Sequence, residues 1–135
     1  SEKSLPRSLD LAVAGAFGIE VRSVKQHFSQ SFKTEGDCLE DIAAELHKKR
    51  GGPPGPTQID TRYLSEDVPY GLVFLLALGR VANVEMPYTQ AMISMAELIV
   101  GEDFLAGNDL IDHLGLASSS VERLLSRVRV SGVVI

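Results

Sequence analysis

Cysteine is almost absent from this chain of 135 residues, in which Cys38 is the single one. One cysteine excludes an intrachain disulfide and a zinc site built from four cysteines. This usage predicts a reducing compartment. The first residues, Ser1 to Ser4, lack the apolar core of a signal peptide. Together these two features predict a soluble, cytoplasmic protein.

Positive charge and long apolar runs are also scarce. The chain has 13 Lys and Arg residues against 18 Asp and Glu residues, for a formal net charge of −5. A protein that binds duplex nucleic acid needs a concentrated basic face, which this chain lacks. The longest apolar run, Gly71–Gly79, ends at Arg80, well short of the roughly 18 residues of a membrane span. The sequence therefore predicts neither nucleic acid nor a membrane as partner.

The remaining composition is typical of a globular domain. Hydrophobic residues form 44% of the chain, close to the globular average of about 45–50%. Domains cluster at roughly 100–150 residues. We therefore expect residues 1–135 to form a single domain with a hydrophobic core, interrupted only by the Gly/Pro-rich stretch Gly51–Pro56.

Apolar residues recur at spacings of three and four along most of the chain, which is the period of an amphipathic helix. This pattern predicts an all-α bundle with a loop over Gly51–Ser65. The tail Val130–Ile135 is predicted to be disordered or to pair as a strand. The predicted helices cover Leu5–Phe17, Val21–Phe32, Cys38–Lys49, Pro69–Val81, Tyr88–Val100, Asp109–Leu114 and Ser120–Val130.

Local residue types predict the helix ends. Residues that favour a first turn or an N-cap are Ser23, Asp37, Pro69, Pro87 and the pair Ser119/Glu122. Residues that favour a helix end are Gly18, Asn83, Gly101 and Gly115. The run Leu72–Leu78 is apolar around its whole circumference, so its helix is predicted to lie at the centre of the bundle.

Residues that carry chemistry are few and scattered. The histidines His27, His47 and His113 lie in separate predicted helices without a second ligand at helical spacing, so no metal site is predicted. Cys38 lies near a helix N-terminus, where a thiol pKa can be lowered, but we favour an inert core or surface residue. The glycines of Gly51–Pro56 follow a helix and are interrupted by prolines, which is not a dinucleotide-binding turn.

The methionines have two open interpretations. Met86, Met92 and Met95 are most simply core residues. In a non-enzymatic helical module, Met86–Met95 and Leu72–Leu78 would instead form an oligomer interface.

One segment concentrates polar side chains before the most apolar helix. It contains Asp60, Arg62, Glu66 and Asp67, followed by Pro69. In one interpretation Glu66 and Asp67 cap the helix N-terminus and stabilise it by about 0.5–2 kcal/mol. In the other, the segment forms half of a site, because the Arg62 guanidinium suits phosphate or carboxylate. The residue types leave both interpretations open.

The stretch from Arg62 to Val73, RYLSEDVPYGLV, resembles the C-terminal domain of the octopine/nopaline (opine) dehydrogenase family. The apolar helix, the Val84–Pro87 turn and the next helix continue the resemblance. Its flanks are Leu9–Ile19 and the Leu-Gly-Leu segment within Asp109–Leu116. The resemblance covers residues 9–116 and leaves 117–135 as a terminal helix and tail. It implies a helical bundle like that of opine dehydrogenases and related 6-phosphogluconate-dehydrogenase-like reductases.

The resemblance also implies a function. In that family an N-terminal Rossmann domain binds NAD or NADP, the helical domain closes over it, and an amino acid is reductively condensed with a 2-oxo acid. By resemblance, Asp67 partners the catalytic histidine and Arg62 reaches the cofactor pyrophosphate. Four more residues match the motif, with supporting or structural roles: Tyr63, Glu66, Pro69 and Gly71. Substrate-binding residues and the choice between NAD and NADP stay open.

The resemblance does not include the family's catalytic histidine or its Rossmann domain, so the chain alone is expected to be inactive. The absence of a first Met suggests an excised domain whose partner is the Rossmann domain of a longer protein. The alternatives are the helical domain of another two-domain 2-oxo acid or imine reductase, and the non-enzymatic module. A helical domain without its partner exposes apolar surface, so a homo-oligomer is expected.

Overall fold

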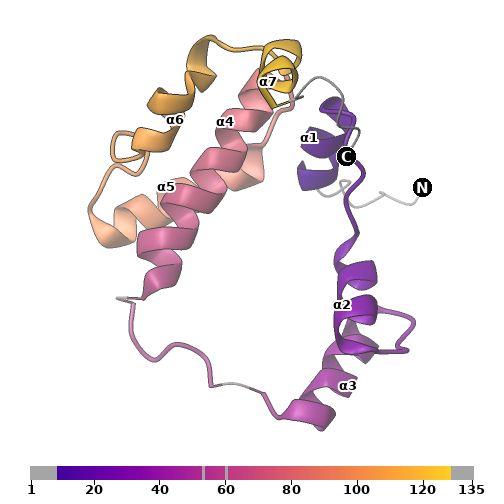
Figure 1. Cartoon of the computed structure of the whole chain (residues 1–135). Helices are drawn as coiled ribbons and strands as arrows, with labels where there is room; N and C mark the ends of the chain where they lie inside the picture. The colour runs from indigo at the N-terminus through magenta and orange to yellow at the C-terminus, as the bar shows by residue number, and fades with distance from the viewer. Residues whose placement is uncertain (1–8, 53, 60, 129–135) are drawn as a thin grey trace, which may run out of the picture. The chain divides into compact units, whose positions relative to one another are not determined.

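The chain is built from helices (Figure 1). The computed structural model describes residues 9–52, 54–59 and 61–128. Over these residues there is no β-strand, which confirms the predicted all-α class. The elements are α1 (Leu9–Ala16), α2 (Val24–Phe32), α3 (Leu39–Arg50), the π-helix η1 (Tyr63–Leu72), α4 (Val73–Val81), α5 (Pro87–Val100), α6 (Asp109–Leu114), the 3₁₀ helix η2 (Leu116–Ser118) and α7 (Val121–Val128).

The chain divides into two compact units. One combines the described residues up to Ile19 with those from Gln58 onward, and the other is Glu20–Thr57. In the first unit, α4 packs against α1, α5 and α6, and its Val73, Leu76 and Ala77 are buried. This confirms the prediction that the apolar run Leu72–Leu78 forms a central helix. The predicted tail Val130–Ile135 and the beginning of the Leu5–Phe17 helix lie outside the described residues.

Several helix ends confirm the sequence predictions. Pro87 is the first residue of α5, and Gly101 ends that helix in the left-handed region, with φ +78°. Helix α6 covers the predicted residues, and Gly115 ends it with φ +64°. Asn83, after α4, also has a positive φ of 54°. These ends were predictable because proline and glycine set the backbone at their own positions.

Two predicted N-caps are wrong by one residue each. Helix α3 begins after Cys38, whose side chain makes no capping hydrogen bond, so Asp37 is not the N-cap. Before α7, the Ser120 hydroxyl accepts a hydrogen bond of 3.2 Å from the backbone N–H of Arg123. The hydroxyl of Ser119 is buried and has no hydrogen-bond partner among the described residues. In both cases the chain enters the helix one position later than the cap pattern predicts.

The core interpretation of the methionines is correct for Met86, which is 4% exposed. It is wrong for Met92 and Met95, which are 59% and 64% exposed. The residues of α5 that face the core are Thr89, Ile93 and Ala96. Helix α5 is therefore apolar on a second, outward face.

In the second unit, α2 packs against α3. Ser23 caps α2 as predicted: its hydroxyl accepts a hydrogen bond from Gln26 N, and Gln26 Oε1 accepts one from Ser23 N. Because Ser23 is the cap, α2 begins at Val24 and the predicted start at Val21 is wrong. The last residues of the two helices are in contact: the Arg50 guanidinium of α3 lies 4.7 Å from the centre of the Phe32 ring of α2.

Glu45 of α3 gives the second unit a pH-dependent contribution to stability. Its Oε1 lies 2.5 Å from Lys49 Nζ, and its Oε2 accepts a hydrogen bond of 2.9 Å from Glu35 N. These contacts, that of Lys49 first, hold the pKa of the Glu45 carboxyl below its ordinary value. A lowered folded-state pKa stabilises the fold above the unfolded-state pKa, and this contribution is lost as pH falls through the folded-state value.

Replacing Lys49 with Met is therefore expected to raise the pKa of Glu45 toward its ordinary value. The pH range in which the contribution disappears should move upward with it. An NMR titration of the Glu45 carboxyl carbon in the parent chain and in Lys49→Met measures the change. An unchanged Glu45 pKa would show that the ion pair of the structure does not form in solution.

Candidate functional site

The segment that carries Arg62 and Asp67 is a π-helix, not the loop and helix start that the sequence predicts. Element η1 runs over Tyr63–Leu72, and its last hydrogen bond joins Val73 N to Val68 O, five positions back. It continues without a break into α4. The predicted loop end at Ser65 and helix start at Pro69 are therefore wrong.

Pro69 lies inside η1 and is buried. A proline within an α-helix lacks an N–H, and its ring clashes with the carbonyl four residues earlier. The i→i+5 hydrogen bonds of a π-helix add one residue to each turn and move that carbonyl away from the ring. The wider turn lets the helix pass through Pro69, whereas the sequence rule for proline at a first turn predicts that the helix starts there.

The wider turn also decides which side chains share a face. Residues five apart lie about 140° apart around an α-helix, which turns about 100° per residue. In a π-helix, with about 4.4 residues per turn, they lie only about 50° apart. Arg62, which has helical φ and ψ of −53° and −23°, and Asp67 are five apart. The π register therefore places them on one face.

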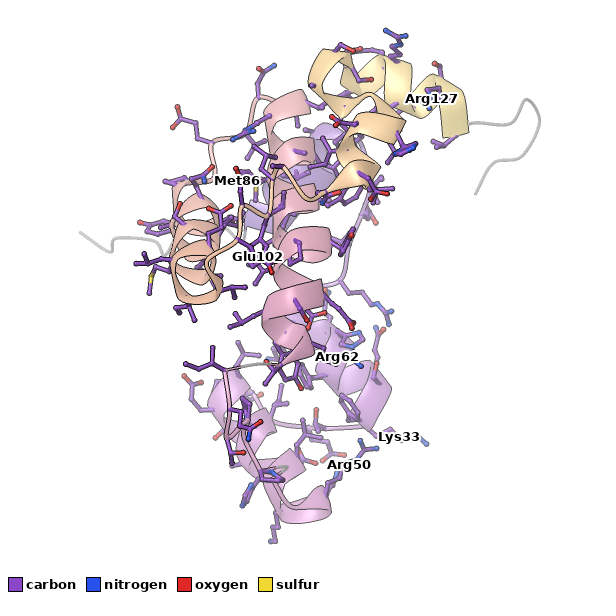
Figure 2. All side chains as sticks on the ribbon, turned by 90° about the vertical axis from the view of Figure 1, so that its left-hand side faces the viewer. Lys33, Arg50, Arg62, Met86, Glu102 and Arg127 are labelled. Carbon is purple, nitrogen blue, oxygen red and sulfur yellow. The ribbon has the colours of Figure 1, made fainter. Side chains whose placement is uncertain are left out.

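That face is exposed. The exposed residues of the segment are Arg62, Tyr63, Ser65, Glu66, Asp67, Tyr70 and Gly71, whereas Val68 and Pro69 are buried. Figure 2 labels Arg62 at the start of the helical segment. Neither the Arg62 guanidinium nor the Asp67 carboxylate forms a hydrogen bond or ion pair with another described residue. Both charges are therefore available to a group outside the described chain.

The alternative in which Glu66 and Asp67 cap the helix N-terminus is wrong. The helix begins before them, at Tyr63, and the N-cap position is Arg62, whose side chain makes no capping hydrogen bond. Asp60, the first acidic residue of the segment, lies outside the described residues. Glu66 lies in the first turn of η1, where a carboxylate favours the helix N-terminus without capping it, and Asp67 lies beyond that turn.

Asn108 is a residue of this region that the sequence analysis missed. It is 2% exposed, and its Nδ2 donates a hydrogen bond of 2.6 Å to the carbonyl oxygen of Pro69, 39 positions away. Its Oδ1 accepts a hydrogen bond of 3.1 Å from Leu110 N, which makes it the N-cap of α6. The asparagine before Asp109 is a recognisable N-cap signal, but no sequence signal shows the contact with Pro69.

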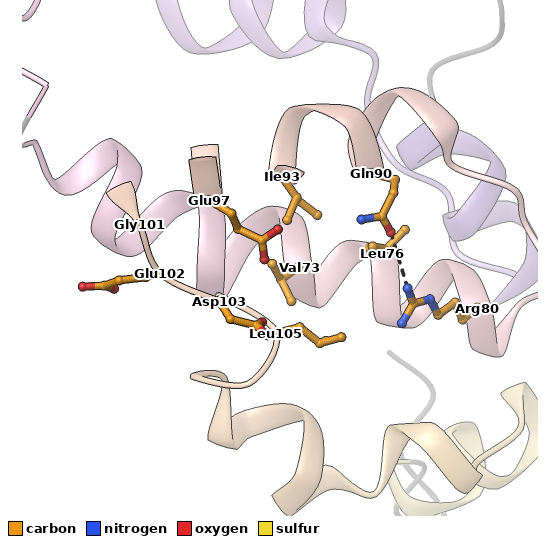
Figure 3. A pocket seen from close by; sticks show the side chains of 10 residues that line it. All are labelled: Val73, Leu76, Arg80, Gln90, Ile93, Glu97, Gly101, Glu102, Asp103 and Leu105. Carbon is orange, nitrogen blue, oxygen red and sulfur yellow. Dashed lines mark hydrogen bonds between the residues drawn. The ribbon is translucent and has the colours of Figure 1, made fainter. Parts of the chain in front are cut away.

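A separate depression of about 500 Å³ lies between α4, α5 and the segment after α5 (Figure 3). Its apolar residues are Val73, Leu76, Ile93 and Leu105, and its polar and charged residues are Arg80, Gln90, Glu97, Glu102 and Asp103. Arg80 donates a hydrogen bond of 3.4 Å to Gln90, and Glu97 accepts one of 3.1 Å from Phe104 N. Arg62 and Asp67 do not line it, so the depression is distinct from the exposed face of η1.

Two of the three histidines, His27 and His113, have contacts within their own helices. His113 Nδ1 lies 2.7 Å from the carbonyl oxygen of Asp109, one turn earlier in α6. The His27 ring packs edge-to-face against the ring of Phe28. Among the described residues, no three His, Cys, Asp or Glu side chains are placed to hold a metal ion.

Cys38 is exposed, and its Sγ donates a hydrogen bond of 3.1 Å to Asp41 Oδ2. The backbone of Asp41 favours the thiolate, but the carboxylates of Asp41 and Glu40 outweigh it and raise the pKa of the Cys38 thiol. A raised pKa keeps the thiol protonated at neutral pH. The alternative of a lowered, reactive thiol pKa is therefore wrong.

No helix within residues 9–52, 54–59 and 61–128 is long and apolar enough to cross a membrane.

The sequence matches the family described as NAD/NADP octopine/nopaline dehydrogenase, alpha-helical domain, over residues 10–100. It is 30% identical over 118 residues to the opine dehydrogenase of Arthrobacter sp. (strain 1C), covering 87% of this chain and 33% of that relative. It is 39% identical over 49 residues to the opine dehydrogenase of Haliotis discus hannai, covering 36% of this chain and 12% of that relative. The chain therefore spans about a third or less of the curated relatives it matches. Because the match covers most of the chain and includes the whole of η1, this chain belongs to the octopine/nopaline dehydrogenase family and carries its alpha-helical domain.

Proposed function

We propose that this chain is the substrate-binding and closure domain of an NAD(P)-dependent opine dehydrogenase-type enzyme, which reductively condenses an amino acid with a 2-oxo acid. The observation that carries the proposal is the exposed face of η1, where Arg62 and Asp67 share one side of the helix without a partner among the described residues. This pair lies within the range matched to the family. The partner in the complete protein is an N-terminal Rossmann domain.

Arg62 suits the cofactor pyrophosphate. Its guanidinium is permanently charged and offers a planar fork of N–H donors, which fits paired phosphate oxygens. The side chain is exposed at the N-cap position of η1, so closure of the domain on a bound dinucleotide brings the two together without rearranging the core. NAD(P)H, when bound, supplies the hydride that reduces the imine formed from the amino group and the 2-oxo acid.

Asp67 acts in this proposal through the family's catalytic histidine, which belongs to the part of the complete protein outside this chain. A carboxylate that accepts a hydrogen bond from an imidazole fixes the ring tautomer and stabilises the protonated ring. The histidine can then give or take a proton at the reacting carbonyl or amine. This chain alone lacks that histidine and the dinucleotide site, so we expect it to be inactive.

The test uses the protein encoded by the complete reading frame that contains this chain. Purified protein is mixed with NADH or NADPH, a panel of 2-oxo acids and a panel of amino acids, and nicotinamide oxidation is followed at 340 nm. The proposal predicts oxidation that requires both an amine and a 2-oxo acid, and a secondary-amine dicarboxylate by mass spectrometry. The chain of 135 residues, assayed in parallel, is expected to show no turnover.

Two results would oppose the proposal. Oxidation with a 2-oxo acid alone, giving a 2-hydroxy acid, would favour the helical domain of another two-domain reductase. The absence of nucleotide binding and of turnover in the complete protein would favour a non-enzymatic module.

The outward face of α5 supports a second role, self-association, in addition to the first. Its exposed apolar residues, with exposed fractions of 53–85%, are Tyr88, Met92, Met95, Leu98 and Ile99. Tyr88, Met92, Met95 and Ile99 are spaced by four, three and four positions, so they form one stripe along the helix. An exposed apolar stripe is typical of a surface that another apolar surface covers.

A homo-oligomer is therefore expected in sedimentation equilibrium. Replacing Met92 and Met95 with Glu should shift the protein toward monomer, because each charge would lie in the covered surface. Replacing the exposed Glu85 with Gln serves as a control away from the stripe. A parent chain that sediments as a monomer at all concentrations would contradict this role.

A further inference from the structure

The junction between η1 and α4 leaves one backbone carbonyl without a donor from its own helix. The last i→i+5 hydrogen bond of η1 joins Val73 N to Val68 O. Helix α4 then continues from Val73 with the i→i+4 bonds of an α-helix. Where the hydrogen bonds change from i→i+5 to i→i+4, one carbonyl acceptor is skipped. Val73 N bonds Val68 O, and an α-helical bond from Phe74 N goes to Tyr70 O, so the skipped carbonyl is that of Pro69.

That carbonyl is buried, and Asn108 supplies its donor. Pro69 is a buried residue of η1, and Asn108 Nδ2 donates to its oxygen over 2.6 Å. Buried carbonyls in native proteins are almost always hydrogen-bonded, because an unpaired one loses its hydration without compensation. The Asn108 amide therefore supplies a hydrogen-bond donor to the one carbonyl that the change from π-helix to α-helix leaves without a donor.

Two residues thus favour the π register from different sides. The Pro69 ring opposes an α-helical register because of the carbonyl four residues earlier. Asn108 binds the carbonyl that the π register leaves open, and it is itself fixed because its Oδ1 accepts a hydrogen bond from Leu110 N at the start of α6. In an α-helical register Asp67 and Arg62 would lie about 140° apart around the helix axis.

We infer that Asn108 is a positioning residue for the candidate site: its hydrogen bond to Pro69 holds η1 in the π register and so keeps Arg62 and Asp67 on one face. The functional part of this inference rests on the proposed function. The geometric part does not, and it can be measured on the chain itself.

The test uses Cu²⁺ as a probe of helix register. Two histidines on one helix face chelate a metal ion, and imidazole is a good ligand for Cu²⁺. One variant carries Arg62→His with Asp67→His, a pair five apart, which shares a face only in the π register. A matched variant carries Arg62→His with Glu66→His, a pair four apart, which shares a face in both registers. All variants carry Cys38→Ser, because the exposed thiol would react with copper.

The pair five apart is expected to bind Cu²⁺ at least about tenfold more tightly than Arg62→His alone, because the second ligand binds intramolecularly. Adding Asn108→Ser, which keeps an N-capping hydroxyl for α6 but not the amide donor, should reduce this affinity to that of the single histidine. The pair four apart should keep its affinity. Isothermal titration calorimetry and the copper visible spectrum report both effects.

The outcomes separate register from general stability. If Asn108→Ser leaves the pair five apart unchanged, Asn108 does not hold the register and the inference is wrong. If both pairs weaken together, Asn108 has only a structural role and the inference is also wrong.

Should circular dichroism show that Asn108→Ser is unfolded, Asn108→Asp at pH 8, which keeps the size and the cap, replaces it. Loss of helix in both variants would count as a general structural role and against the inference.

A failure of the proposed function is distinguishable from a failure of this inference. The copper measurement does not depend on catalysis. Retained turnover in an Asp67 variant of the complete enzyme would oppose the proposed function while leaving the register result intact.

Discussion

A loss of about 10²–10⁴-fold in kcat is expected when Asp67 is replaced by Asn in the complete dehydrogenase of the proposed function, since this is the usual contribution of a positioned acid–base group. Asparagine keeps the size of the side chain but removes the charge that stabilises a protonated histidine. Because the Asp67 side chain is exposed and has no hydrogen-bond partner among the described residues, the free energy of unfolding should change by no more than about 0.5 kcal/mol. Steady-state kinetics and thermal unfolding of the same preparations measure both quantities.

The matched control is Asp112→Asn, the same change at an exposed aspartate of α6. It should leave kcat unchanged. The pH profile adds a second readout: loss of the carboxylate should lower the pKa of the partner histidine and move the profile to lower pH. An Asp67→Asn enzyme with parental kcat but a lower Tm would assign Asp67 to the fold and not to the reaction.

Replacing Arg62 with Ala is expected to weaken nucleotide binding about 10–100-fold, because hydrogen bonds to charged groups contribute about 1.5–3 kcal/mol. The effect should be seen in the Kd of NAD(P)H and in its KM. The KM of the amino acid should change less. Fluorescence titration with the reduced nucleotide measures the binding directly.

Arg62→Lys separates charge from geometry, because lysine keeps the charge but not the planar fork. It should recover part of the affinity. Arg123→Ala removes an exposed arginine from α7 and should leave nucleotide binding unchanged. If Arg62→Ala binds nucleotide as tightly as the parent enzyme and has the same steady-state constants, Arg62 does not contact the cofactor.

The parts of the fold that the sequence predicts correctly are those set by local residues. Pro87, Gly101 and Gly115 fix the backbone at their own positions, so the bounds of α5 and α6 follow from residue type. The run Leu72–Leu78 predicts a central helix because an all-apolar helix has no face for solvent. These inferences need no knowledge of the rest of the chain.

The register of η1 could not be predicted in the same way. The residue type of Pro69 favours a first turn, but its carbonyl is paired with Asn108, 39 positions later. No pattern within η1 shows a partner at that separation. A sequence rule that considers one helix at a time therefore chooses the commoner use of proline and misses the π-helix.

The outward side chains of α5 illustrate the same limit. Methionine is a residue type typical of a hydrophobic core, but the exposure of Met92 and Met95 depends on which elements cover α5 in the folded chain. For Arg62 and Asp67, residue types left a cap and a site equally open. Their proposed roles come from the resemblance to opine dehydrogenases, and the structure adds that the π register places both on one exposed face.

The most direct test of the central claim is a crystal structure of the complete protein with NADH or NADPH bound. We expect the Arg62 guanidinium to contact the pyrophosphate and the Asp67 carboxylate to accept a hydrogen bond from a histidine outside this chain, both from one face of the helical segment. A structure in which the bound nucleotide and the histidine lie away from that face, with Arg62 and Asp67 in bulk solvent, would contradict it.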